Sequence, residues 1–241
     1  MVETGHFASL WHKMANKLGV VTEFLETNWR SGADPQALAT RLSEDATHQI
    51  KAVCVVHNET STGCTSPIAK IRAVMDDINH PALLMVDTIS SLASIDYRHD
   101  EWGVDVTVAG SQKGLLLPPG LSFNAVSQKA LKVARSGGMP RSYWDWDEQI
   151  KANKNGAFPY TPATNLLYGL EVAIEMLHEE GLDAVFARHD RHAQTTRNAV
   201  QAWGLEVLCQ NPESYSSSLT AVVVPCLLYT SDAADEEDSV D

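Results

Sequence analysis

Long apolar runs are absent from this 241-residue chain. No stretch of about 18 uncharged apolar residues occurs, so the sequence predicts no membrane-spanning helix. The first residues also lack the basic region, the apolar segment and the small-residue cleavage site that are typical of a secretory signal. We therefore expect a cytoplasmic protein that has no membrane partner.

Basic residues are scarce as well. Lysine and arginine number 18 against 31 aspartates and glutamates, which gives a formal net charge of −13. A nucleic-acid-binding protein normally presents a basic face, so nucleic acid is excluded as a partner. The four cysteines are widely separated, which fits reduced thiols better than a disulfide framework and provides no paired spacing for a metal. No Gly-x-Gly-x-x-Gly follows a predicted strand, so a dinucleotide-binding fold has little support.

The acidic excess is concentrated at the C-terminal end. Residues 226–241 hold six acidic side chains and no lysine or arginine. A disordered acidic tail would explain that composition. The stretch "CLLYTSDAADE" also looks like the translation of a transposon adapter used in sequencing libraries. We expect 226–241 to be such an artefactual tail, disordered and outside the fold.

The chain does contain an alternation of short β-branched apolar runs and amphipathic segments. The apolar runs predict buried strands, and the segments between them have the apolar spacing of helices. This alternation predicts an α/β fold with a mostly parallel sheet that is covered by helices on both faces. Helices are expected at 34–46, 66–79, 164–180 and 182–204, and strands at 50–58, 81–90, 103–111, 120–127 and 218–225.

Polar side chains follow three of the predicted strands. The stretch "HNETSTG" comes after the first strand, Asp87 ends the second, and Gln112 and Lys113 follow the third. In open sheets of this class ligands bind beyond the strand ends. Asp87 and Lys113 are separated by one crossover and one strand, as expected of neighbouring parallel strands whose ends meet at one site.

An aldehyde cofactor such as pyridoxal phosphate needs this kind of pair. A lysine must form an imine with the aldehyde, and a carboxylate must keep the ring nitrogen protonated so that the ring accepts electrons. Taken alone, Asp87 could equally cap a helix or a turn, and Lys113 could be a turn lysine with its ammonium in water. Their spacing favours the site, and we expect the Lys113 amine to be confined away from water, which favours its neutral form.

Several stretches together resemble one known family, the class V, fold-type I pyridoxal-phosphate-dependent aminotransferases. The resemblance rests on "KAVCVVHNETSTG", "VDTISSLASIDYRHDEWGVDVTVAGSQKGLLLPPG", "PRSYWDWDEQ" and "FPYTPATNLLYGLEVAIEMLHEEGLDAVFARH", and it extends from Glu3 to Pro225. It is strongest to the bacterial branch that uses glyoxylate as the amino acceptor. The resemblance implies a fold-type I large domain, pyridoxal phosphate as the cofactor, and transfer of the amino group of L-serine to glyoxylate.

Other activities remain open at this point. Alanine or another amino acid could be the donor, because the resemblance implies that the donor is selected largely by regions outside this chain. The chain could also be an inactive fragment or a non-catalytic binding module that keeps the fold, although retention of Asp87 and Lys113 speaks against that. A cysteine desulfurase would need a nucleophilic cysteine on a mobile loop, and no such loop is recognisable.

The resemblance implies catalytic and cofactor roles for three strand-end residues. Lys113 would hold the cofactor as an imine and move protons between the substrate and the cofactor. Asp87 would pair with the pyridine nitrogen. Thr60 would form a hydrogen bond with the ring oxygen, a role that the serine found in some relatives can also fill.

Three further residues are implied as cofactor contacts. Gln112 would contact the phosphate, and Phe7 would stack on the pyridine ring. Thr161 would reach the phosphate bound by the partner subunit, which makes the expected active unit a homodimer. Taken alone, Phe7 could be a core residue and Thr161 a turn residue. His57 is assigned no catalytic role.

The resemblance also implies a division into domains. Residues 1–204 would form the cofactor-binding large domain without its N-terminal part, and 205–225 would begin a C-terminal small domain. The phosphate-binding loop of small residues and the arginine that binds the substrate carboxylate are expected in the missing parts. No arginine of this chain matches that motif.

Overall fold

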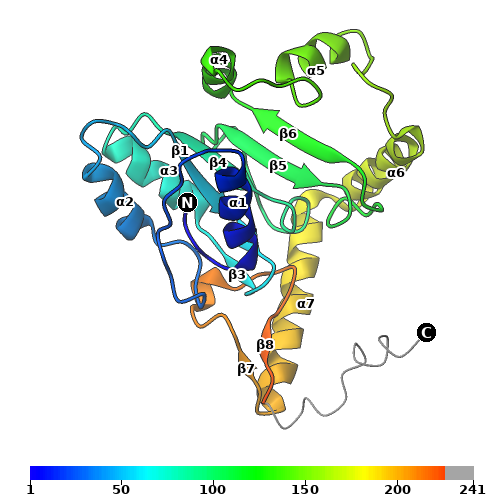
Figure 1. Cartoon of the computed structure of the whole chain (residues 1–241). Coiled ribbons are helices and arrows are strands. Elements are labelled where there is room, and N and C mark those ends of the chain that lie inside the picture. Colours follow the sequence, from blue (N-terminus) through cyan, green and yellow to red (C-terminus); the bar gives the residue numbers. More distant parts are fainter. Residues whose placement is uncertain (226–241) are drawn as a thin grey trace, which may run out of the picture.

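The computed structural model describes residues 1–225, and the predicted tail 226–241 lies outside the described residues. Helices and strands alternate along most of the chain (Figure 1). The helices are α1 (His6–Lys17), α2 (Pro35–Ser43), α3 (Ile68–Asp77), α4 (Gln128–Ser136), α5 (Trp146–Asn153), α6 (Thr164–Glu180) and α7 (Leu182–Ala202). The strands are β1 (Ala52–Val56), β2 (Asn58–Glu59), β3 (Cys64–Thr65), β4 (Leu83–Asp87), β5 (Val106–Gly110), β6 (Ser122–Val126), β7 (Glu206–Val207) and β8 (Val222–Val223).

The main sheet has four strands in the order β1-β4-β5-β6. Strands β1, β4 and β5 are parallel, and β6 is antiparallel to β5. The predicted mostly parallel α/β sheet is therefore confirmed. Asp87, the last residue of β4, lies beside Val56 of β1 and Val108 of β5, so the carboxyl ends of the parallel strands share one edge.

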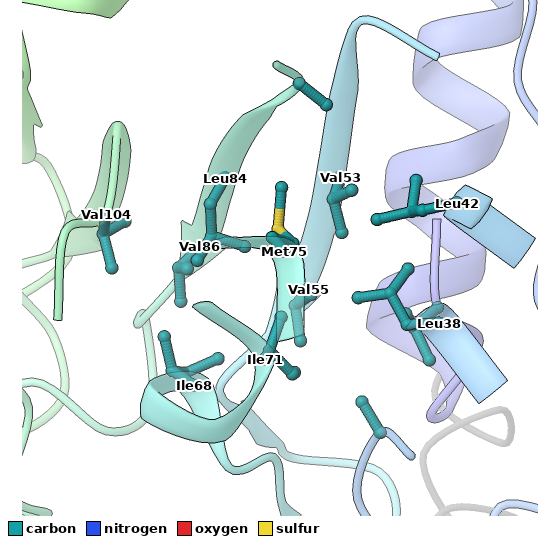
Figure 2. Packing of buried hydrophobic residues seen from close by; sticks show 13 residues of the cluster. Leu38, Leu42, Val53, Val55, Ile68, Ile71, Met75, Leu84, Val86 and Val104 are labelled. Atoms are coloured by element: carbon teal, nitrogen blue, oxygen red, sulfur yellow. The ribbon is translucent and has the colours of Figure 1, made fainter. Parts of the chain in front are cut away.

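The hydrophobic core lies between β1, β4 and the two helices α2 and α3 (Figure 2). Alternate residues of each strand point into it, as the two-residue period of a strand requires. Full burial of one such aliphatic side chain contributes about 1.5–3 kcal/mol. The labelled members in Figure 2 are Leu38, Leu42, Val53, Val55, Ile68, Ile71, Met75, Leu84, Val86 and Val104.

The two faces of the sheet are buried to different extents. On the face opposite the core, Cys54 of β1 and Met85 of β4 are only half-buried, although Val56 is buried, and most of β6 is exposed. The polar residues Ser122 and Asn124 explain the exposure of β6, because an antiparallel edge strand can face water on one side.

Helices α6 and α7 begin and end close to their predicted limits, and Gly181 separates them. Gly181 has a φ of 82°, a conformation that glycine adopts without steric cost. Helix α1, in contrast, has no side-chain cap from its own N-cap residue, Gly5, and the local pattern did not predict it. None of the helices within residues 1–225 is both long and apolar enough to cross a membrane.

Candidate active site

A cavity of about 540 Å³ opens beside the segments that follow the strands of the main sheet. One wall comes from the turns after β2, β4 and β5 and includes Thr60, Ser90 and Lys113. The other wall comes from the junction of α6 and α7, with Glu180 and Arg188. The cavity thus joins two of the predicted strand-end segments to a helical hairpin from later in the chain.

Lys113 stands on the turn that follows β5. Its neighbour Gly114 packs so closely that a Cβ there would overlap the carbonyl oxygen of Leu92 and come within 2.6 Å of Ser94 Oγ. The side chain of Lys113 itself is exposed. We expected the Lys113 amine to be confined away from water, and this expectation is wrong. The lysine lies on a turn at an open cavity and not inside a strand.

Asp87 is half-buried at the end of β4. One carboxylate oxygen, Oδ1, accepts a hydrogen bond from the Ile89 N–H at 2.8 Å. Burial raises the pKa of Asp87 above its ordinary value, and the nearby Glu59 adds to that rise. Among the residues that the structure describes, no lysine, arginine or histidine forms an ion pair with this carboxylate. Within residues 1–225, the ionised Asp87 carboxylate at the end of β4 therefore has no positively charged side chain paired with it.

Hydrogen bonds between polar side chains connect the strand ends to the C-terminal segment. Asn58 Nδ2 donates to Ser90 Oγ and to Ser218 Oγ, both at 2.9 Å. Ser90 Oγ donates back to the Asn58 carbonyl oxygen at 2.7 Å, and Ser218 Oγ donates to the Ser90 carbonyl oxygen at 3.0 Å. Ser90 and Ser218 line the cavity, and the sequence patterns had not singled out either serine. Ser90 follows the β4 strand end by three residues, whereas no local signal marks Ser218.

His57 is buried next to the cavity-lining turn. Its Nδ1 lies 2.9 Å from Ser91 Oγ, and its ring packs 5.2 Å from the Tyr97 ring centroid. Burial lowers the pKa of His57 to about 4. The imidazole is therefore neutral at pH 7, and its contacts are those of a packed structural side chain.

The remaining predicted cofactor contacts lie outside this cavity wall. Phe7 is 41% exposed on the first turn of α1, and its N–H donates to Glu59 Oε1 at 3.2 Å. Gln112 is exposed, with its Oε1 folded over Gly110. Thr161 is exposed in the segment before α6. The structure thus brings Thr60 and Lys113 to one cavity, puts Asp87 at the same sheet edge, and places the other three elsewhere on the surface.

An ion pair on the opposite wall was not expected from the sequence. Arg188 donates two hydrogen bonds to Glu180, from Nε at 2.6 Å and from Nη2 at 2.8 Å. Next to it, burial lowers the pKa of His189. These residues follow no strand, and they lie on both sides of the turn at Gly181 that joins α6 to α7.

Comparison with known proteins gives matches along nearly the whole chain. The family model described as Aminotransferase class-V matches residues 1–233. The serine–glyoxylate aminotransferase of Hyphomicrobium methylovorum is 48% identical over 227 residues, which are 93% of this chain and 56% of that protein. The L-aspartate–glyoxylate aminotransferase of Paracoccus denitrificans is 42% identical over 221 residues, which are 92% of this chain and 56% of that protein.

The fold is also found in solved structures. The pyridoxamine–pyruvate aminotransferase of Mesorhizobium loti superposes with a TM-score of 0.85 at 30% sequence identity. The match covers 93% of this chain and 57% of that one. The chain therefore spans little more than half the length of the proteins that it matches.

Proposed function

Because the chain belongs to the class-V aminotransferase family, we propose that it is part of a pyridoxal-phosphate-dependent transaminase that transfers the amino group of L-serine to glyoxylate. The products are hydroxypyruvate and glycine. One observation carries the proposal: Thr60 and Lys113 line one cavity, and Asp87 ends a strand at the same edge of the sheet. The chain covers 56% of the serine–glyoxylate relative, so this activity is proposed for the whole protein.

The residues present fit the cofactor. The Asp87 carboxylate is half-buried, has a raised pKa and pairs with no cation in the described part of the chain. Asp87 would hold the protonated pyridine nitrogen of the cofactor, which would supply the missing positive charge. When bound, pyridoxal phosphate supplies an aromatic ring that withdraws electrons from the substrate α-carbon. Lys113 would hold the cofactor covalently, and Thr60 would hold its ring oxygen.

Each of these side chains has its own task in the proposed reaction. The Lys113 amine, once released from the cofactor, would take the proton from the substrate α-carbon and deliver it to the cofactor carbon that carries the amino nitrogen. The close packing of Gly114 against Leu92 and Ser94 fixes the turn that carries this amine. Asp87 would keep the ring nitrogen protonated, and the Thr60 hydroxyl would orient the ring.

The three outlying residues are retained as cofactor contacts. Gln112 adjoins Lys113 and would reach the phosphate, and the exposed Phe7 would stack on the ring. Thr161 does not line the cavity of its own chain, which supports a contact with the cofactor of a partner subunit. Tyr143 and Tyr160, whose ring centroids lie 4.9 Å apart, are exposed beside it and would add apolar surface to a homodimer.

The domain division and the location complete the proposal. Residues 1–204 belong to a cofactor-binding large domain, and 205–225 begin a small domain. A cytoplasmic location is supported by the free thiols of Cys54, Cys64 and Cys209, since free thiols are typical of a reducing compartment.

A second donor is favoured by a specific comparison. The Paracoccus denitrificans relative is named for L-aspartate, although it is nearly as similar to this chain as the serine enzyme. The whole protein can be purified and supplied with glyoxylate and with serine, alanine or aspartate in turn. The amino donor that gives the highest rate of glycine formation is then the preferred one. Faster turnover with alanine or aspartate than with serine would replace the serine assignment.

The cofactor assignment is tested on the 241-residue chain itself. Reduction with borohydride in the presence of pyridoxal phosphate should add a stable pyridoxyl group to Lys113, located by peptide mass spectrometry. The Lys113→Ala variant should lose this label, and Lys70→Ala, which removes an exposed lysine, should keep it. A label that persists in Lys113→Ala at the same stoichiometry would contradict the assignment.

A further inference from the structure

Glu59 is the most completely buried acid of the described chain that the proposed reaction leaves without a task. Its side chain belongs to β2, is 0% exposed and forms no ion pair within residues 1–225. Its carboxylate accepts hydrogen bonds instead. Ser61 donates to Oε1 from its N–H at 3.1 Å and from its hydroxyl at 2.7 Å. An ionised carboxylate can remain buried when hydrogen-bond donors surround it in this way.

The other donors to Glu59 belong to the first turn of α1. The N–H of Phe7 donates to Oε1 and the N–H of Ala8 to Oε2, each at 3.2 Å. The N–H of His6 donates to Ser61 Oγ at 2.9 Å. These are the N–H groups that a helix start leaves without partners, and a negative charge beside them is favourable. Glu59 and Ser61 therefore cap α1 from more than 50 residues away in the sequence.

Gly5 makes this contact possible. A Cβ at Gly5 would lie 2.5 Å from Glu59 Cγ and 2.5 Å from Ser61 Oγ. No real side chain tolerates such distances, so only glycine lets the start of α1 approach the turn. The absence of a side-chain cap at the start of α1 is thereby explained, because the cap arrives from β2.

Glu59 also links two of the residues that the proposed function assigns to the cofactor ring. It holds the backbone of Phe7, and it directly precedes Thr60 in the chain. We propose that Glu59 is a positioning residue: its carboxylate locks α1 to the 59–61 turn and so sets where the Phe7 ring stands relative to the Thr60 hydroxyl. The inference rests on the proposed function, since a ring must lie between these two side chains. Glu59 itself would touch neither substrate nor cofactor and would act through the positions of Phe7 and Thr60.

The substitution Glu59→Gln tests the lock with little change of shape. One carboxylate oxygen becomes an amide nitrogen, which cannot accept a hydrogen bond from the N–H group that points at this position in the parent chain. Amide hydrogen exchange at Phe7 and Ala8 should become about tenfold faster in the cofactor-free chain. The matched control is Asp34→Asn, an acid-to-amide change at the start of α2, where asparagine caps as well as aspartate. In this control variant, the amide hydrogens of Phe7 and Ala8 should exchange at the same rate as in the parent chain.

Cofactor affinity separates positioning from general stability. Pyridoxal phosphate, titrated by its visible absorbance, should bind about tenfold more weakly to Glu59→Gln than to the parent or to Asp34→Asn. With an analogue that lacks the ring hydroxyl, the loss caused by Glu59→Gln should shrink to about threefold or less, because there is then no contact with Thr60 to misplace. Equal losses with both cofactors would mean that Glu59 is merely structural and would overturn the proposal.

The other outcomes are also decisive. Unchanged exchange at Phe7 and Ala8 in Glu59→Gln would show that the carboxylate does not hold α1. If the parent chain binds no cofactor at Lys113, the proposed function fails for this chain, whereas the exchange measurement still decides whether Glu59 fixes α1.

If Glu59→Gln does not fold, Ser61→Ala takes its place, because it leaves the Glu59 carboxylate unchanged and removes one hydrogen-bond acceptor and one donor. Faster exchange at His6 is expected there, and an unchanged rate would contradict the lock.

Discussion

Asn58 and Ser218 are joined by a hydrogen bond of 2.9 Å although 160 residues separate them in the chain. The Asn58 side chain is buried, and it also binds Ser90, which lies on the cavity wall. The segment after α7 is thereby attached to the strand ends. Because Ser90 and Ser218 both line the cavity, this attachment connects the stability of the fold to the shape of the proposed site.

Replacing Asn58 by alanine should lower the free energy of unfolding by about 2–3 kcal/mol, because it removes a buried amide that donates to Ser90 and Ser218 and accepts from Thr65. Urea titration at pH 7 measures the change. Asn124→Ala is the matched control, since this asparagine is exposed on β6 and its side chain binds only Ser122, at 3.4 Å, among the described residues. Similar losses in both variants would show that the Asn58 network contributes no special stability.

Replacing Asp87 by asparagine should separate cofactor binding from stability. Burial raises the pKa of Asp87, so its ionised form destabilises the cofactor-free fold, and this cost grows as the pH rises through the native pKa. Asp87→Asn should therefore unfold at pH 7 with an equal or greater free energy than the parent. Affinity for pyridoxal phosphate should fall about 100-fold, because the ring nitrogen loses its counter-charge. Retained affinity, measured by absorbance titration, would argue against the proposed role of Asp87.

The buried His57 should make stability depend on pH. Its native pKa is about 4 against an ordinary value of 6.5, so between these pH values the unfolded chain binds a proton that the folded chain does not. Stability should therefore decrease as the pH falls from 6.5 to 4, by about 3 kcal/mol from this group. His57→Gln should flatten that part of the curve in urea titrations from pH 7 to 4.5. His178→Gln, an exposed change on α6, should leave the curve as it is in the parent.

Gly114→Ala should disturb the turn that carries Lys113. The added methyl group would overlap the Leu92 carbonyl oxygen, so the turn must move and the free energy of unfolding should fall by about 2–4 kcal/mol. Gly138→Ala is the control, because within residues 1–225 a methyl group there would meet nothing within 4 Å apart from its own chain neighbours. Calorimetry compares the two variants. Borohydride labelling of Lys113 should also weaken in Gly114→Ala, and normal labelling would show that the turn tolerates the shift.

Local patterns in the sequence were sufficient for the elements that depend on neighbouring residues. The apolar periodicity of 164–180 and 182–204 predicts α6 and α7, because residues three and four apart share a helix face. The run that ends at Asp87 predicts β4, and the alternation of strands with helices predicts the parallel sheet. These features require no knowledge of distant contacts.

The tertiary structure alone decided which distant residues meet. Helix α1 is capped by Glu59, the cavity is completed by Arg188 and Ser218, and Lys113 stands exposed and not enclosed. Neither periodicity nor local turn chemistry contains these outcomes, because each depends on packing between segments that lie far apart in the chain. The sequence by itself thus determined the elements and the strand-end positions of Asp87 and Lys113. Burial, helix capping and the opposite wall of the site were decided by how those elements pack.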